Sequence, residues 1–278
     1  MSVDQCPLQF YFKYRNECGS CKHYDQLNAQ CQNEESIYFE SPCSKNDCCS
    51  KYSKFEQSSN AFSQCGALVH ELLEGYFTGR LLFNELAPLF QDHFYDYVTT
   101  RFPFKKMETS YYDTCLEFLS SFSGIDGYNI IGSEIDFYTT IKSGNKSAKF
   151  HGVIDLLIQD KETGEFIVCD FKSKKSFKDK NERNKYAKQI YLYSLYVKEK
   201  YGVFPSELRF ILFRSNTVER IVFDEKELNS AIDWIFTQID KIKNTTMFRS
   251  SINEFFCDNL CDFKDSCPAI IEWRDSDD

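Results

Sequence analysis

Charged residues interrupt two short apolar stretches of the chain in a pattern that suits a metal ion. Asp155 lies inside the run VIDLLI, and Asp170 and Lys172 end a second run, VCDFK. An ionised carboxylate in a buried strand is costly unless it is paired or binds a cation. Residues two apart on a strand face the same way, so we expect Asp170 and Lys172 to lie side by side. Two carboxylates and an ammonium group suit metal-assisted hydrolysis of a phosphodiester.

An ordinary structural explanation exists for the same three residues. Asp170 and Lys172 would then be surface residues at the end of a strand, and Asp155 would pair with a nearby lysine. The pattern D-x-K is frequent by chance, so on its own it favours this explanation. Motifs elsewhere in the chain shift the balance toward a catalytic site.

The sequence around these residues predicts an α/β domain. Apolar residues form 42% of the chain and aromatic residues 17%, which is enough for a packed core. Apolar residues at helical spacing predict helices over residues 65–80, 84–100, 108–123, 187–200 and 225–243. Alternating or short apolar runs predict strands over residues 131–141, 150–158, 165–171, 207–213 and 218–223. The second and third strands should form a hairpin, and the whole order predicts a sheet flanked by helices.

Five motifs, spread over residues 66–193, resemble those of the RecB-like branch of the PD-(D/E)XK nuclease superfamily, and they occur in that family's order. The Gly-Val-Ile-Asp sequence that ends at Asp155 resembles the second motif, and the Asp-Phe-Lys sequence that begins at Asp170 resembles the third. Fourteen residues separate the two. Upstream, the helical segment around His70 resembles the first motif, and Glu134 matches an additional acidic residue. Downstream, Gln189 to Tyr193 matches the family's Q-x-x-x-Y motif, whose two ends share a helix face.

The resemblance implies a restriction-endonuclease-like fold, with a mixed central sheet flanked by helices, and a metal-dependent deoxyribonuclease activity. It implies Mg²⁺ or Mn²⁺ ions held by His70, Asp155, Asp170 and the carbonyl of Phe171. Glu134 would assist catalysis, and Lys172 would position the attacking water.

The charge distribution qualifies the net charge of −9, which by itself argues against general affinity for nucleic acids. Residues 172–188 carry eight basic residues and only two acidic ones. Taken alone, this segment is a solvated lysine-rich loop. Because it directly follows the candidate catalytic strand, we expect it to hold the phosphate backbone of DNA, with Lys174 and Lys175 among the contacts and Gln189 and Tyr193 nearby.

Thirteen cysteines in a chain expected to be intracellular indicate metal rather than disulfides. Cys257, Cys261 and Cys267 are closely spaced, and Cys6 begins a Cys-Pro sequence followed by aromatic residues. This arrangement resembles RecB-like nucleases that carry a [4Fe-4S] cluster, including the AddB-type subunits and the small CRISPR-associated exonucleases. One residue more separates the first two C-terminal cysteines than is common in that group. Zinc on the same four thiolates is the alternative.

A second group of cysteines lies in a polar segment, residues 17–60, that resembles nothing in the family's pattern. We interpret it as an insertion held by zinc, with Cys18 and Cys21 as ligands. The candidates that would complete the site are Cys31 and Cys43, or Cys48, Cys49 and His23, and the thiols of this segment could also compete with Cys6 for the cluster. The predicted organisation is therefore a cluster region of residues 1–16 and 251–278, the cysteine-rich insertion, and a nuclease core of residues 61–250. Cys115 and Cys169 lie in apolar surroundings and should be ordinary buried thiols.

The resemblance implies an exonuclease, because single-stranded DNA ends are the usual substrate of the family's small members, and we expect the protein to be cytoplasmic. It would serve DNA repair, recombination, or CRISPR or phage DNA processing. Neither a membrane-spanning run nor a signal peptide is evident. The phosphate-binding motif of helicases is also missing from the sequence, so helicase activity would come from a partner protein of a recombination or CRISPR system. Two alternatives remain: a non-cleaving DNA- or protein-binding module on a nuclease fold, and a redox or regulatory protein.

Overall fold

The computed structural model describes residues 6, 8–9, 24–25, 30–31, 57–123, 125–245 and 249–275 of the chain. The chain divides into two compact units. One consists of residues 61–240, and the other combines residues 1–60 with residues 241–278.

A five-stranded mixed sheet forms the centre of the unit of residues 61–240. Its strands lie in the order in which they follow one another in the chain. They are β3 (Tyr128–Ser143), β4 (Lys146–Asp160), β5 (Phe166–Lys172), β6 (Glu207–Leu212) and β7 (Thr217–Val222). All neighbouring strands are antiparallel except β5 and β6, which are parallel and are connected through helix α5 (Lys180–Tyr201). The hairpin predicted between the second and third strands is confirmed as β4 and β5.

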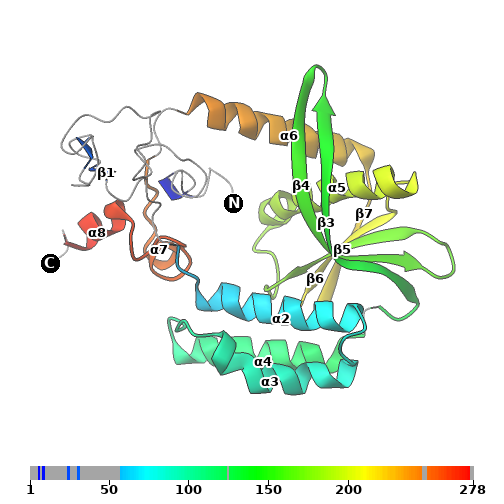
Figure 1. Cartoon of the computed structure of the whole chain (residues 1–278), viewed down its shortest axis with the longest axis horizontal. Helices are drawn as coiled ribbons and strands as arrows, with labels where there is room; N and C mark the ends of the chain where they lie inside the picture. Colours follow the sequence, from blue (N-terminus) through cyan, green and yellow to red (C-terminus); the bar gives the residue numbers. More distant parts are fainter. Residues whose placement is uncertain are drawn as a thin grey trace. The chain divides into compact units, whose positions relative to one another are not determined.

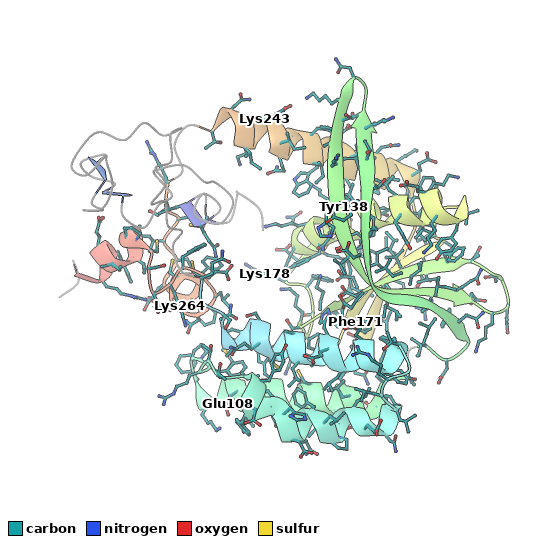
Figure 2. The ribbon with its side chains drawn as sticks, viewed as in Figure 1. Glu108, Tyr138, Phe171, Lys178, Lys243 and Lys264 are labelled. Atoms are coloured by element: carbon teal, nitrogen blue, oxygen red, sulfur yellow. The ribbon has the colours of Figure 1, made fainter. Side chains whose placement is uncertain are left out.

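Helices cover both faces of this sheet, as Figure 1 shows. One layer consists of α2 (Ala61–Phe77), α3 (Phe83–Tyr97) and α4 (Lys105–Ser121), and the other of α5 and α6 (Glu225–Asn244). Each layer has its own apolar core against the sheet. Phe171, labelled in Figure 2, belongs to the core under α2 and stacks on Phe77 with ring centroids 5.9 Å apart. The predicted mixed sheet flanked by helices is therefore confirmed. None of the described helices is both long and apolar enough to cross a membrane.

Each helix and strand predicted between residues 65 and 243 has a counterpart, with shifted ends. Helix α5 begins at Lys180, seven residues before its predicted start. Asp179 caps it, because its side chain accepts a hydrogen bond from the backbone N–H of Glu182 at 2.8 Å. Half of the basic segment is consequently helix and not loop. Helix α2 ends at Phe77, earlier than predicted, where Gly79 turns the chain back with a φ of 75°.

Strands β3 and β4 are longer than predicted and extend beyond the rest of the sheet as a two-stranded hairpin. They pair with each other from Tyr128↔Asp160 to Ser143↔Lys146, whereas β4 pairs with β5 only from Leu156 to Gln159. We name the outer part, residues 135–154, the hairpin arm. Its polar residues did not end the strands because each strand satisfies the other's backbone groups along the whole arm.

The unit formed by the two chain ends contains short elements. These are the strand pair β1 (Tyr24–Asp25) and β2 (Gln30–Cys31), and the helices α7 (Glu254–Asn259) and α8 (Pro268–Asp275). Leu8 donates a backbone hydrogen bond to Arg249 at 3.2 Å, and Ser58 donates one to Asp262 at 2.7 Å. The chain's N-terminal and C-terminal segments are thus bonded to each other.

Gly152 is required by a close approach of aromatic rings to strand β4. A Cβ atom at this position would lie 2.8 Å from ring atoms of Phe137 and 2.9 Å from Cε1 of Tyr193. Both contacts are shorter than real Cβ atoms tolerate. The glycine of the Gly-Val-Ile-Asp motif therefore admits the Tyr193 ring of α5 to the sheet.

We expect Gly152→Ala to lower the free energy of unfolding by about 1–3 kcal/mol, because the two rings must shift. Urea denaturation monitored by circular dichroism measures this. The control is Gly66→Ala on α2, where a Cβ atom would meet only Ser173, at 3.9 Å, and should not destabilise the fold. An unchanged midpoint in Gly152→Ala would contradict the steric role of the glycine.

Candidate metal centre

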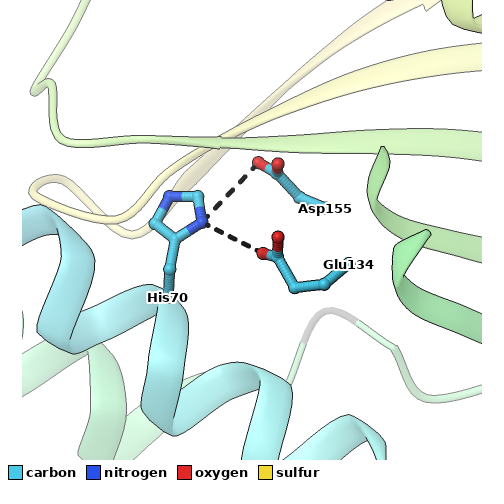
Figure 3. Close-up of side chains that lie close together, drawn as sticks. All are labelled: His70, Glu134 and Asp155. Atoms are coloured by element: carbon cyan, nitrogen blue, oxygen red, sulfur yellow. Dashed lines mark ion pairs between the residues drawn. The ribbon is translucent and has the colours of Figure 1, made fainter. Parts of the chain in front are cut away.

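Three side chains from α2, β3 and β4 converge on one point (Figure 3). Nδ1 of His70 lies 3.5 Å from Oε1 of Glu134 and 3.9 Å from Oδ2 of Asp155. One donor atom from each residue lies within 4.8 Å of the donor atoms of the other two. His70 and Asp155 were predicted as metal ligands, and Glu134 was predicted as an assisting acid. The structure brings these three residues together.

The backbone changes conformation where these carboxylates leave the sheet. Glu134 has a φ of 48°, in the left-handed region that non-glycine residues rarely adopt. Ile154 packs in the core under α5, but Leu156, two residues on, packs in the core under α2. The side-chain alternation of β4 therefore changes phase at Asp155, which lets Asp155 and Leu156 both lie on the α2 side. The strain at Glu134 costs on the order of 1 kcal/mol.

Asp155 is held in place by the neighbouring strand. Its Oδ2 accepts a hydrogen bond from the backbone N–H of Phe171 at 2.7 Å. Burial, and then the charge of Asp170, raise the pKa of Asp155 to about 6, although His70 and the Phe171 bond act in the opposite direction. Burial lowers the pKa of His70, but the hydrogen bond to Glu134 and the charges of Asp155 and Glu134 outweigh it, so that this pKa is raised. The centre thus concentrates negative charge that a cation would relieve.

Asp170 and Lys172 face the same way, as predicted, and form an ion pair. Nζ of Lys172 lies 2.6 Å from Oδ2 of Asp170, whose side chain is only 3% exposed. Burial raises the pKa of Asp170, and Lys172 opposes that shift. Asp170 is outside the group of converging ligand atoms among the described residues, because its carboxylate turns toward this lysine. The surface position of the ordinary explanation is excluded, since Asp170 is 2% exposed.

The donor set fits a hard divalent cation. Carboxylate oxygens bind Mg²⁺ and Mn²⁺, and imidazole nitrogen is a further ligand for transition metals. Donors of one octahedral ion at about 2.1 Å lie roughly 3 Å apart when adjacent and roughly 4.2 Å apart when opposite, and the 3.5 Å and 3.9 Å separations from Nδ1 of His70 fall between these values. Small movements of side chains would therefore complete a site.

An open cleft of about 740 Å³ leads to this centre. His70 and Glu134 line it together with residues that were not predicted from the sequence: Phe62, Ser63, Gly66, Ala67, Glu71, Glu74, Arg80 and Ser173. Arg80 pairs with Glu74 across 3.0 Å at the edge of the cleft. Glu74 follows His70 by one helical turn, so the shared helix face could have indicated it.

The predicted DNA-binding residues have different environments. The side-chain amide of Gln189 donates to the hydroxyl of Tyr193, as expected for residues one helical turn apart, and burial raises the pKa of that phenol. Lys174 pairs with Glu182 at 2.9 Å, whereas Lys175 is exposed. The basic segment is thus partly neutralised by its own acidic residue.

The four cysteines predicted to hold a cluster line one pocket in the unit of the chain ends. Cys6, Cys257, Cys261 and Cys267 all border it, together with Phe256, Phe263 and Ile270. Burial raises the pKa of Cys261 to about 12. Burial also raises the pKa of Cys267, with a contribution from the neighbouring Cys6 and Cys257. A cation bound beside Cys261 and Cys267 would favour their thiolate forms.

The cysteines of the predicted zinc site fall largely outside the described residues. This applies to Cys18, Cys21 and Cys43, and Cys31 is described only through the backbone of β2. Cys115 and Cys169 are fully buried, as predicted. Cys115 lies on α4, with its sulfur 3.7 Å from that of Cys65 on α2.

Comparison with known proteins decides the family. The model of the PD-(D/E)XK nuclease superfamily matches residues 49–268. The chain belongs to this superfamily. Among solved structures it is similar to the one titled "Crystal structure of SSO0001", with 17% identity and a TM-score of 0.31, over 59% of this chain and 79% of that chain. The curated proteins contain no match.

Membership of the PD-(D/E)XK superfamily confirms the predicted fold class and the predicted superfamily; the RecB-like branch within it stays a prediction. Members of this superfamily are nucleases that use divalent metal ions, and a group of His, Glu and Asp side chains able to hold one is present in this chain. The family therefore gives a coarse activity, the metal-dependent cleavage of phosphodiester bonds in DNA.

Replacing the strained residue of the metal centre should separate stability from metal binding. In metal-free buffer, Glu134→Gly should unfold with a free energy about 0.5–1 kcal/mol higher than Glu134→Gln, since both variants lose the carboxylate but only glycine relieves the left-handed backbone. Both variants should lose most of the increase in melting temperature that Mn²⁺ gives the parent protein. A glycine variant no more stable than the glutamine variant would show that the backbone stores no strain there.

Proposed function

We propose that this protein is a metal-dependent exonuclease that degrades single-stranded DNA from its ends. The observation that carries the proposal is the convergence of His70, Glu134 and Asp155 in an open cleft, beside the buried Asp170–Lys172 pair. DNA repair, recombination, and CRISPR or phage DNA processing are the settings that such an activity would serve. A helicase or recombination protein would be its partner.

The proposed ligands of Mg²⁺ or Mn²⁺ are His70, Asp155, Asp170 and the carbonyl of Phe171, with Glu134 assisting. A divalent cation bound there would polarise a phosphoryl oxygen and acidify a water molecule. Both backbone groups of Phe171 would then serve the site. Its N–H group orients Asp155 through a hydrogen bond, and its carbonyl oxygen is the proposed ligand. A cation would also compete with Lys172 for the carboxylate of Asp170.

Lys172 is the proposed positioning group for the attacking water. Its ammonium group lies 2.6 Å from Asp170 and 5.5 Å from the centre of the Tyr186 ring, and 20% of its side chain is exposed. Release from Asp170 would leave an ammonium group in a low-dielectric site, where its charge acts strongly on the developing phosphorane charge.

DNA would be held mainly through its phosphates, without reading of sequence. Lys175 is exposed and available for such a contact, and Lys174 would need to exchange Glu182 for a phosphate. Gln189 and Tyr193 would contact the strand near the cleft.

A [4Fe-4S] cluster on Cys6, Cys257, Cys261 and Cys267 is proposed as a structural element of the unit of the chain ends. All four cysteines border one pocket of that unit, and this shared lining supports a common inorganic group. Zinc on the same four thiolates is the alternative. For Cys18, Cys21, Cys31 and Cys43 we keep the zinc site as a proposal.

The nuclease proposal is tested with end-labelled single-stranded DNA and Mn²⁺. We expect Lys172→Met, which keeps the length of the side chain and removes its charge, to lower the rate about 10²–10³-fold. Lys226→Met makes the same charge change at an exposed position on α6, away from the proposed site, and should stay within about threefold of the parent. A circular single strand should resist degradation, because it has no ends.

Three results would contradict the proposal. Undiminished cleavage by Lys172→Met would remove the lysine from the mechanism, and tight binding of DNA without any cleavage would favour the non-cleaving module. Cleavage of the circular strand would make the enzyme an endonuclease.

The cluster proposal is tested by purification without oxygen. The parent protein should contain about four iron atoms and absorb visible light, and Cys261→Ser should lose both together with stability, because metal binding contributes folding energy. Lys172→Met serves as the control and should keep its iron, since it lies in the other unit. A protein with zinc in place of iron on these cysteines would overturn the proposal.

A further inference from the structure

The hairpin arm carries an exposed pair of stacked rings that the metal centre does not use. Tyr138 on β3 and His151 on β4 are directly opposite in the strand register. Their ring centroids are 4.4 Å apart and the ring planes differ by 10°. Tyr138 is 71% exposed, and Figure 2 labels it on the arm.

A carboxylate fixes the orientation of this pair. Nε2 of His151 lies 2.7 Å from Oδ2 of Asp136, which is two residues before Tyr138 on the same strand. The imidazole is therefore held flat against the phenol. The two rings thus form an aromatic surface that is ordered by contacts between exposed side chains and not by packing in the core.

The ring pair lies on the face of the arm that continues from the two carboxylates at its base, Glu134 and Asp155. Along β4, His151, Val153 and Asp155 alternate with Gly152 and Ile154, which face α5. Along β3, Tyr138 follows Glu134 by four residues. Both rings are therefore roughly 13 Å from the carboxylates along their strands, at about 3.3 Å per residue.

Basic residues continue this face toward the tip of the arm. Lys149 pairs in register with Thr140, and Lys142 with Ser147, so that each lysine shares the face of the rings. Both lysines are exposed, and no ion pair joins either of them to a carboxylate in the part of the chain described. Carboxylates, rings and lysines thus follow one another along one exposed face.

We propose that Tyr138 and His151 form a stacking platform for the bases of single-stranded DNA, with Lys149 and Lys142 contacting the phosphates. Exposed rings beside lysines are the means by which proteins hold single strands without reading their sequence. The platform would hold the strand roughly 13 Å from the metal centre. This assignment rests on the proposed function, because it takes DNA as the substrate.

An ordinary role of the ring pair is to stabilise the hairpin, since cross-strand aromatic pairs do so. That role predicts an effect on unfolding and none that depends on bases in a ligand. A binding measurement with and without bases therefore separates the two roles.

The experiment measures binding of a fluorescently labelled oligothymidine to the full chain in EDTA, by anisotropy. A second strand of the same length carries abasic sites in place of the bases. Tyr138→Val removes the ring and keeps a residue suited to a strand, and Tyr138→Phe keeps the ring and removes the hydroxyl. The control Tyr95→Val removes a tyrosine of similar exposure, 64%, from α3.

We expect Tyr138→Val to raise the Kd for oligothymidine roughly 5- to 150-fold. Tyr138→Phe and Tyr95→Val should stay within about twofold of the parent. The parent should bind the abasic strand more weakly than oligothymidine, and Tyr138→Val should bind the two strands equally. Circular dichroism and thermal unfolding confirm that each variant is folded.

The platform is overturned if folded Tyr138→Val binds oligothymidine as the parent does, or if the parent does not distinguish the two strands. Neither result bears on cleavage, because EDTA removes the metal. If Tyr138→Val binds oligothymidine as tightly as the parent, and the parent degrades DNA, only the platform is rejected. If the affinity depends on the Tyr138 ring but the parent never cleaves DNA, only the nuclease activity is rejected.

Discussion

Two carboxylates buried on neighbouring strands are the constraint on which the rest of the structure depends. Asp155 and Asp170 repel each other where little water screens them, and each is raised in pKa mainly by burial. A different group stabilises each carboxylate. The N–H group of Phe171 donates a hydrogen bond to Asp155, and the ammonium group of Lys172 forms an ion pair with Asp170. His70 comes from another layer, on α2, whose apolar side chains pack against the sheet in a shared core. The helices, the phase change in β4 and the strained Glu134 all serve this charge balance.

The fold and most of the site follow from patterns that repeat along the chain. The helical and strand periodicities located all the core elements, because each reports which side of an element is buried. The order of the motifs indicated that His70, Glu134 and Asp155 belong together, although they are far apart in the sequence. Asp170 and Lys172 were placed on one face by the two-residue period of a strand alone.

Other parts of the site depend on tertiary detail that no local pattern carries. The left-handed Glu134 and the change of phase at Asp155 arise from the balance between two cores on opposite sides of the sheet, and alternation alone predicts neither. The pairing of Lys174 with Glu182 depends on α5 beginning at Lys180. The first turns of this helix are polar, so the spacing of apolar residues did not predict them. The ring pair of the hairpin arm was missed because Tyr138 and His151 are distant in the sequence and neither belongs to a motif.

The restricted pairing of β4 has a consequence for how this protein can vary. Since β5 holds β4 only from Leu156 to Gln159, residues added at the tip of the hairpin arm, beyond the buried Ile141, lie away from the catalytic layer. Insertions of two residues in each strand would keep every side chain on its face, whereas an insertion of one would exchange the two faces. The reach of the tip can therefore vary in whole steps of the strand period, while Phe137, Ile141 and Gly152 keep the rest of the arm packed against α5.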